Sequence, residues 1–126
     1  MFGWFKKKNK RPAVGPDFSD VDSLARADRL YQQGKLEKLF LMPPEFGGED
    51  HPLNTLYVPV GFAEIKSRID LNTIAELIEA GQVTQYNASP EYQGKSFIPI
   101  AIEIVASNPG NFTATINMWG DALSRE

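Results

Sequence analysis

Hydrophobic positions repeat with two different periods along this chain, and the period separates expected helices from expected strands. Residues 20–33 carry apolar side chains at helical spacing, with Ser19 or Asp20 as candidate capping residues. Residues 70–80 repeat the pattern and contain the threonine and glutamate of a capping-box spacing. A glycine, the residue that most often ends a helix, follows each segment. Both segments are therefore predicted to be helices.

Strand-like alternation fills most of the remaining chain. Short strands are expected at residues 35–42, 55–61 and 82–88. Residues 96–106 place four isoleucines on one face, which predicts a strand with one buried side. An Asn-Pro-Gly-Asn turn then leads into residues 112–119, which alternate in the same way. These last two strands are expected to form a hairpin.

Residues 62–69 fit both periods. Small or apolar residues alternate with charged residues through the segment, which favours a strand. Phe62, Ile65 and Ile69 also fit one face of a helix. We expect a strand here, with the helix as the alternative.

The order of these elements predicts an α+β fold. No strand–helix–strand rhythm runs through the chain, so a doubly wound parallel sheet is not expected. The prediction is a mainly antiparallel sheet of four to six strands with two helices packed on one face. We expect residues 17–126 to form this single domain and residues 1–16 to form a basic and aromatic leader with a flexible Pro/Gly linker.

Charge is divided unevenly along the 126 residues. Residues 1–11 hold five of the 13 basic residues and no acidic residue. The rest of the chain has eight basic and 16 acidic residues, a net charge of −8. Because nucleic-acid affinity comes largely from neutralising phosphates with Lys and Arg, no nucleic-acid partner is expected.

The leader has two interpretations. Its apolar part is too short for a secretory signal or a membrane span, so we expect a cytoplasmic protein. Its aromatic and basic residues could contact the inner face of a membrane, as a weak peripheral anchor. The alternative is a solubilising start of the chain, or aromatic residues that fold back onto the domain. The candidate membrane-surface residues are Phe2, Trp4, Phe5, Lys6, Lys7 and Lys8.

Residues 43–54 form the longest predicted loop, and loops of this length are often functional. The segment holds Glu45, Glu49 and Asp50 beside His51, the single histidine of the chain. A metal site or an acid–base group is one interpretation, but no second histidine completes a usual zinc set. A solvated acidic loop is the other interpretation, and no metal is predicted.

Motifs for catalysis and cofactors are missing from the sequence. The chain has no cysteine, no Gly-x-Ser-x-Gly elbow and no phosphate-binding glycine motif. We therefore predict no catalytic set and no cofactor. Glu103, in the middle of an apolar strand, is a candidate acidic group, with the solvent-facing side of a half-exposed sheet as the alternative.

Surface aromatic residues and the acidic loop point to a protein partner. Tyr86, Tyr92 and Trp119 lie on or beside the last strands, and such side chains often anchor interfaces, although they are also common in cores. The leading hypothesis is a non-catalytic protein-binding module whose partner has a basic surface. A small acidic domain without a catalytic set is also what we expect of a toxin-neutralising immunity protein. The alternative is a small-ligand binder or enzyme with a pocket between sheet and helices that uses Glu103 or His51. The candidate partner-binding residues are Glu45, Glu49, Asp50, His51, Tyr86, Tyr92 and Trp119.

Overall fold

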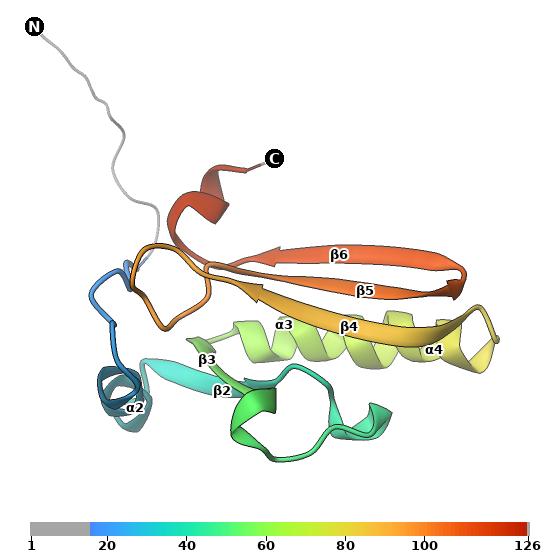
Figure 1. Ribbon diagram of the computed structural model, residues 1–126, viewed down its shortest axis with the longest axis horizontal. Helices are drawn as coiled ribbons and strands as arrows, with labels where there is room; N and C mark the ends of the chain where they lie inside the picture. Colours follow the sequence, from blue (N-terminus) through green and yellow to red (C-terminus); the bar gives the residue numbers. More distant parts are fainter. Residues whose placement is uncertain (1–15, 126) are drawn as a thin grey trace, which may run out of the picture.

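A computed structural model describes residues 16–125 of the chain, which fold into an α+β arrangement (Figure 1). The described strands form one sheet of three strands and one of two, and every pairing is antiparallel. The larger sheet has the order β4-β5-β6 and the smaller one pairs β2 with β3. The strands are β2 (Leu36–Phe40), β3 (Thr55–Pro59), β4 (Val83–Glu91), β5 (Ala101–Pro109) and β6 (Asn111–Asn117).

The α+β class and the antiparallel pairing predicted from the sequence are confirmed, but the single sheet of four to six strands is wrong. The two sheets are joined by side chains instead of a backbone ladder. The carbonyl oxygen of Leu41, just past the end of β2, accepts a hydrogen bond from Lys66 Nζ at 2.9 Å, and Tyr86 Oη lies 3.2 Å from it. These contacts connect the end of β2 to the second helix and to β4 of the larger sheet.

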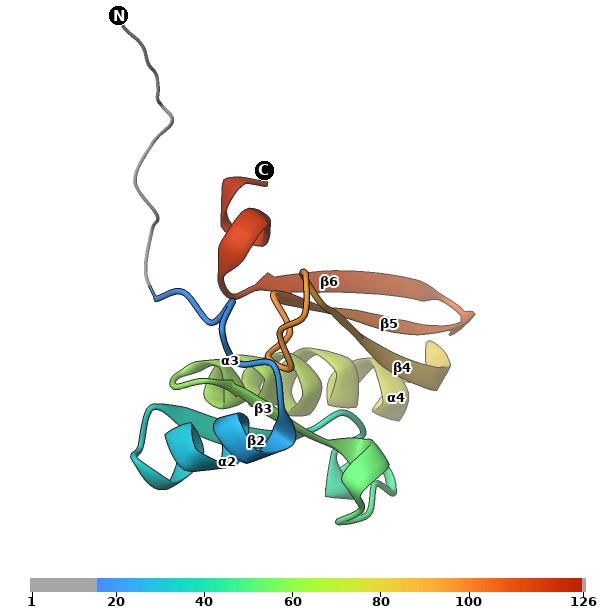
Figure 2. The same cartoon turned by 60° about the vertical axis from the view of Figure 1, so that its left-hand side comes forward.

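The helices also lie apart from one another. Helix α2 (Leu24–Gln32) packs against β2 and β3, beside which it lies in Figure 2. Its N-cap is Ser23, whose side-chain oxygen accepts a hydrogen bond from the backbone N–H of Arg26. The second helix runs along the three-stranded sheet, with the small sheet on its other side (Figure 1). The two helices therefore do not share one face of one sheet, as the sequence had suggested.

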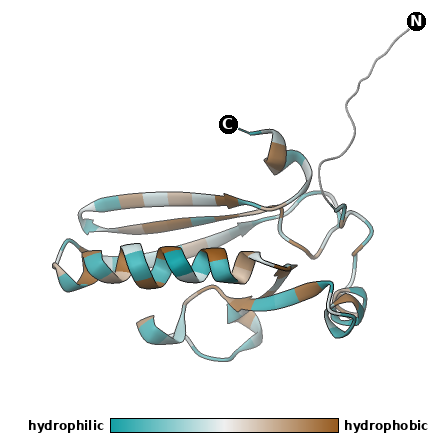
Figure 3. Cartoon of the chain, turned by 180° about the vertical axis from the view of Figure 1, so that it is seen from behind, coloured by the Kyte–Doolittle hydropathy of each residue, from teal (hydrophilic) through white to brown (hydrophobic). Residues whose placement is uncertain are grey.

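The second helix starts eight residues earlier than the sequence pattern suggested. It is continuous through α3 (Phe62–Arg68), a wide π-turn named η3 (Ile69–Ile74) and α4 (Ala75–Glu79). The strand expected at residues 62–69 is therefore wrong. Its inward face includes the charged residues Lys66 and Asp70, which broke the apolar helical pattern. The outward face mixes hydrophilic and hydrophobic residues (Figure 3), with Ile65 and Ile78 both exposed.

A local feature explains why this helix begins where it does. Gly61 has a positive φ of 104°, a conformation that side chains other than glycine rarely adopt. The carboxylate of Glu37, on β2, accepts hydrogen bonds from the backbone N–H groups of Gly61 and Ala63 at 2.8 and 2.9 Å. A carboxylate at this position stabilises the positive end of the helix dipole.

The core is a single cluster to which the three-stranded sheet, the second helix, α2 and the two-stranded sheet all contribute. The four isoleucines that the sequence placed on one strand face are all buried, although β5 starts only at Ala101 and the first two precede it. The opposite face of the sheet is mostly polar, and Glu103 is exposed on it. Three short 3₁₀ turns complete the described chain: η1 (Pro44–Phe46), η2 (Pro52–Asn54) and η4 (Gly120–Ser124).

Candidate functional site

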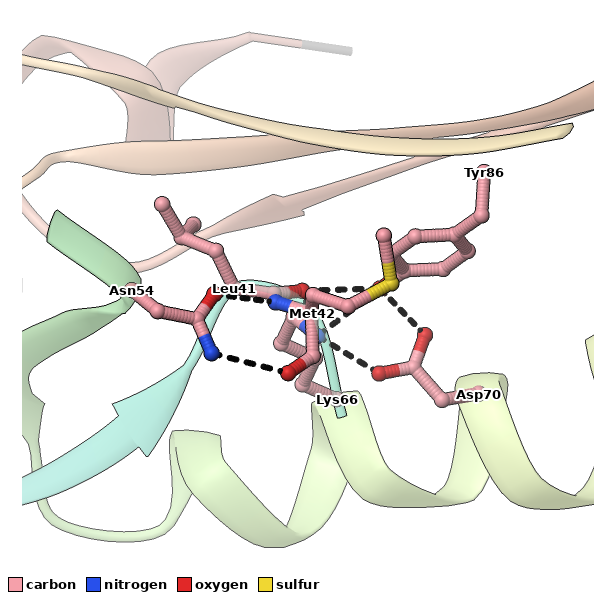
Figure 4. Close-up of polar contacts among 6 residues, drawn as sticks. All are labelled: Leu41, Met42, Asn54, Lys66, Asp70 and Tyr86. Carbon is pink, nitrogen blue, oxygen red and sulfur yellow. Dashed lines mark hydrogen bonds and ion pairs between the residues drawn. The ribbon is translucent and has the colours of Figure 1, made fainter. Parts of the chain in front are cut away.

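The acidic loop, residues 43–54, is closed at its base by one side chain. The amide of Asn54 accepts a hydrogen bond from the backbone N–H of Met42 at 2.8 Å and donates to the carbonyl of Met42 at 3.0 Å (Figure 4). The same amide nitrogen lies 3.0 Å from the carbonyl oxygen of Glu49. These bonds hold the two ends of the loop together, and a compact loop whose ends lie close together is an Ω-loop.

Two further contacts fix the interior of the acidic loop. Gly48 donates its backbone N–H to the carbonyl of Pro43 at 2.9 Å, and a Cβ at Gly48 would overlap the carbonyl oxygen of Met42. Phe46 packs edge-to-face on Tyr86 of β4, with 5.3 Å between ring centroids. The loop is therefore a folded, anchored structure that requires glycine at one position.

The charged residues of the acidic loop face solvent. Glu45, Glu49, Asp50 and His51 are all exposed, and the loop contains no lysine or arginine. Within residues 16–125 none of the three carboxylates forms an ion pair. His51 uses Nδ1 to accept a hydrogen bond from the backbone N–H of Leu53 at 3.1 Å, so it caps the η2 turn. The loop thus presents three separate negative charges on a fixed backbone.

A buried polar cluster lies directly behind the acidic loop. Lys66 Nζ donates to Asp70 Oδ2 at 2.6 Å, to Tyr86 Oη at 2.8 Å and to the carbonyl of Leu41 at 2.9 Å (Figure 4). Tyr86 Oη donates in turn to Asp70 Oδ1 at 2.8 Å. Lys66 and Asp70 are each 2% exposed. We call Lys66, Asp70, Tyr86 and the Leu41 carbonyl the buried cluster.

Burial shifts the titration of two members of this cluster. Desolvation lowers the pKa of Lys66, although the hydrogen bond and the charge of Asp70 act in the opposite direction. Desolvation also raises the pKa of Tyr86 far above its usual value, and the neighbouring Asp70 carboxylate adds to this effect. Lys66 has three N–H donors and all three have acceptors, so the ammonium group is fully engaged in internal bonds.

The π-turn η3 contains Asp70, the residue that the second helix contributes to the buried cluster together with Lys66. This wide turn shifts the helical register, and its two buried residues are Asp70 and Ile74. Such turns are often found at functional sites. The sequence could not show this, since the segment has no proline or glycine to mark an irregular helix.

A surface pocket of about 260 Å³ opens between the acidic loop and the second helix. One wall comes from β2 and the start of the loop, including Phe40, Pro43 and Glu45. The helix supplies the opposite wall, and Lys66 and Asp70 lie at its base. The loop, the pocket and the buried cluster therefore form one continuous region.

The other residues predicted to form a site lie elsewhere. Neither Glu103 nor His51 lines the pocket, so the structure does not bring together the groups expected for a pocket enzyme. Tyr92 is 46% exposed, outside the pocket, and burial of the rest of its side chain raises its pKa. The candidate membrane-surface residues at positions 2–8 lie outside the described part of the chain.

Trp119 is not the surface anchor that the sequence suggested. It is 1% exposed, its indole N–H donates to the carbonyl of Ile98 at 3.2 Å, and its ring packs edge-to-face on Phe18. The reason is that β6 ends at Asn117, so the alternation stops and both Met118 and Trp119 turn inward. Tyr86 is also directed inward, since its hydroxyl belongs to the buried cluster.

Sequence reasoning missed Lys66, Asp70 and Asn54. A lysine and an aspartate four residues apart match a helical ion pair, but that signal is typical of exposed helix faces. Asn54 is an ordinary loop residue by composition. Only the fold shows that these three side chains tie the acidic loop to the helix and to β4.

Comparison of the chain with protein-family models, with curated proteins and with solved structures gives no match. Among residues 16–125, no three His, Cys, Asp or Glu side chains gather closely enough to hold a metal ion. No helix in this part of the chain has the length and apolar character needed to cross a membrane.

Proposed function

We propose that this chain is a non-catalytic module that binds a protein with a basic surface, and that the acidic loop makes the central contact. The observation that supports this function is a folded loop that exposes Glu45, Glu49 and Asp50 without an ion pair to any other described residue. Charges of one sign on a surface attract a partner of the opposite sign and speed its capture.

The fixed backbone of the loop favours binding for an entropic reason. A flexible loop loses conformational freedom when a partner orders it, and this cost weakens association. Here Asn54 and the close approach at Gly48 have already ordered the loop in the free protein. The three carboxylates can therefore meet a complementary surface with little further ordering.

The state of the buried cluster supports a binding role over a catalytic one. A catalytic lysine or tyrosine needs a free donor or lone pair directed at a substrate. Lys66 uses its three donors internally, and the Tyr86 hydroxyl donates to Asp70. The cluster instead supports the loop, because it holds the Leu41 carbonyl next to the base of the loop.

Toxin neutralisation is the specific form of this function that we propose. Blocking a toxin requires tight binding and no chemistry, and an acidic surface suits toxins that act on nucleic acid or membranes through basic residues. The partner would then be a basic protein made by the same cell.

Affinity capture with matched charge variants tests the proposal. The loop variant is Glu45→Gln with Glu49→Gln and Asp50→Asn, and the control removes three exposed carboxylates elsewhere, at Glu76, Glu79 and Glu103. Both variants change the net charge by the same amount. The full chain and the control should retain one stoichiometric basic partner from the native cell, and the loop variant should lose it.

Two results would contradict this proposal. Capture of no stoichiometric protein by the full chain would refute the binding function. Equal loss of the partner in both variants would show that net charge alone matters and that the acidic loop has no special part.

A further inference from the structure

The pocket beside the acidic loop has a chemistry that selects one kind of occupant. We propose that it receives a single arginine side chain of the basic protein partner. This inference rests on the proposed function and adds to it the site where one partner residue inserts. The pocket volume of about 260 Å³ is on the scale of one large side chain.

The walls of the pocket suit the aliphatic stem and the flat head of an arginine. Leu39, Phe40, Pro43 and Pro44 form an apolar wall, against which methylene groups can pack. An arginine guanidinium also stacks on aromatic rings, and Phe40 supplies one. A lysine ammonium is compact and strongly hydrated, so it gains less from such a wall.

The carboxylates of the pocket can accept hydrogen bonds, whereas its one ammonium group has no donor left. The three N–H groups of Lys66 are bonded to other acceptors, and prolines 43 and 44 have no N–H at all. Asp70 is buried and already paired with Lys66, so the accessible acceptor is Glu45 at the rim, which has no ion pair within residues 16–125. A ligand with many donors and a positive charge matches this arrangement.

The same groups disfavour an anionic ligand such as a phosphate. An anion in the pocket would meet the Glu45 carboxylate and would find no unused donor on Lys66. The start of α3 offers no alternative anion site, because the Glu37 carboxylate already accepts hydrogen bonds from its first free N–H groups.

A titration of the full chain with a small probe tests the arginine site without a protein partner. The probe is N-acetyl-arginine methylamide, added to the isotopically labelled protein while backbone amide shifts are followed by NMR. The expected result is saturable shifts at Glu45, Ser67 and Leu71, with the weak affinity typical of so small a ligand. The matching citrulline derivative, which has the same shape without the charge, should produce no saturable shift.

Variants of the pocket sharpen the titration. Glu45→Gln should weaken the probe by about threefold to fivefold, the effect of removing one partly exposed charge pair. Glu103→Gln removes the same charge from the exposed face of the larger sheet, outside the pocket, and should leave binding unchanged. Ser67→Phe should abolish binding by filling the pocket, whereas Ser67→Ala should retain it.

The outcomes separate this inference from the proposed function. Equal binding of the citrulline derivative, or shifts spread over all exposed carboxylates, would overturn the arginine site. Since the titration uses no partner protein, that result would leave the acidic loop to be judged by the capture experiment. If the probe binds as expected but no partner depends on the loop, the proposed function fails instead.

Discussion

Removing one charge from the buried cluster should destabilise the protein far more than removing both. Asp70→Asn leaves the Lys66 ammonium at 2% exposure without its carboxylate, and Lys66→Met leaves the Asp70 carboxylate without its ammonium. The double variant, Lys66→Met with Asp70→Asn, has no buried charge and nearly the original shape. The cluster is therefore expected to behave as one coupled unit.

The magnitudes follow from the bonds in the structure. Each single substitution leaves an uncompensated buried charge, which costs about 3–5 kcal/mol. The double variant loses the Lys66 hydrogen bonds, but the single proton of Tyr86 Oη keeps an acceptor in the side-chain oxygen of the amide that replaces the Asp70 carboxylate. The cost of the double variant should be about 1–3 kcal/mol, so the coupling free energy should be about 3 kcal/mol or more.

Urea unfolding followed by circular dichroism measures these differences in the free energy of unfolding. The second helix supplies a matched control in the ion pair of Arg68 with Glu64, which has the same spacing but side chains 68% and 69% exposed. Glu64→Gln should change stability by less than about 0.5 kcal/mol. If the double variant loses as much as the two single variants together, the cluster is not a coupled unit and the reasoning is refuted.

The pH dependence gives this prediction a second signature. Burial holds the pKa of Lys66 in the folded protein below its ordinary value of 10.5. At pH values between the folded-state pKa and 10.5, the unfolded chain therefore binds more protons than the folded chain. The contribution of Lys66 to stability therefore rises with pH towards 10.5. Asp70→Asn removes a group that raises the pKa of Lys66, so the free energy of unfolding should increase more with pH in this variant than in the unmodified protein. Equal increases in the two proteins would contradict the pairing of Lys66 with Asp70.

Three further predictions concern individual residues. Trp119→Ala should lower the free energy of unfolding by about 3–5 kcal/mol, because it empties a buried site, and an unchanged melting temperature would contradict its place in the core. Tyr86→Phe should lower the free energy of unfolding by a constant amount below about pH 10 and by a smaller amount above it. The pKa of Tyr86 is raised in the folded protein, so the stability that this residue contributes falls as the tyrosine of the unfolded chain ionises. Urea unfolding at about pH 8–11 measures the difference between the two proteins, and a difference that stays constant would refute the prediction. Asn54→Ala should speed amide hydrogen exchange within residues 42–54 but not within β5, and unchanged exchange would show that the Asn54 bonds do not hold the loop.

Individual segments show where sequence patterns were sufficient. The alternation of isoleucines before and within β5 predicted burial correctly, because all four side chains lie in the core. The long loop was also recognised from its prolines and glycines, and it does lie outside the α-helices and strands. In both cases local residue preference and tertiary packing favour the same conformation.

Residues 62–69 show why other segments were misread. Period analysis assumes that polar residues face solvent, but Lys66 and Asp70 face inward and satisfy each other there. A helix with two charged residues on its buried face loses its apolar stripe and imitates a strand. Trp119 was assigned to an exposed face although it is buried. The alternation was extended to residue 119, but β6 ends at Asn117.

The sequence by itself determined the α+β class, the antiparallel hairpins, the negative charge of the domain and the acidic character of residues 43–54. Those properties depend on composition and on neighbours within a few positions of the chain. Only the tertiary structure decided that the strands divide into two sheets, that Lys66, Asp70 and Tyr86 meet, and that a pocket opens beside the acidic loop. These depend on contacts between residues 4 to 45 positions apart, and whether a buried charge finds its partner is settled only when the whole chain has packed.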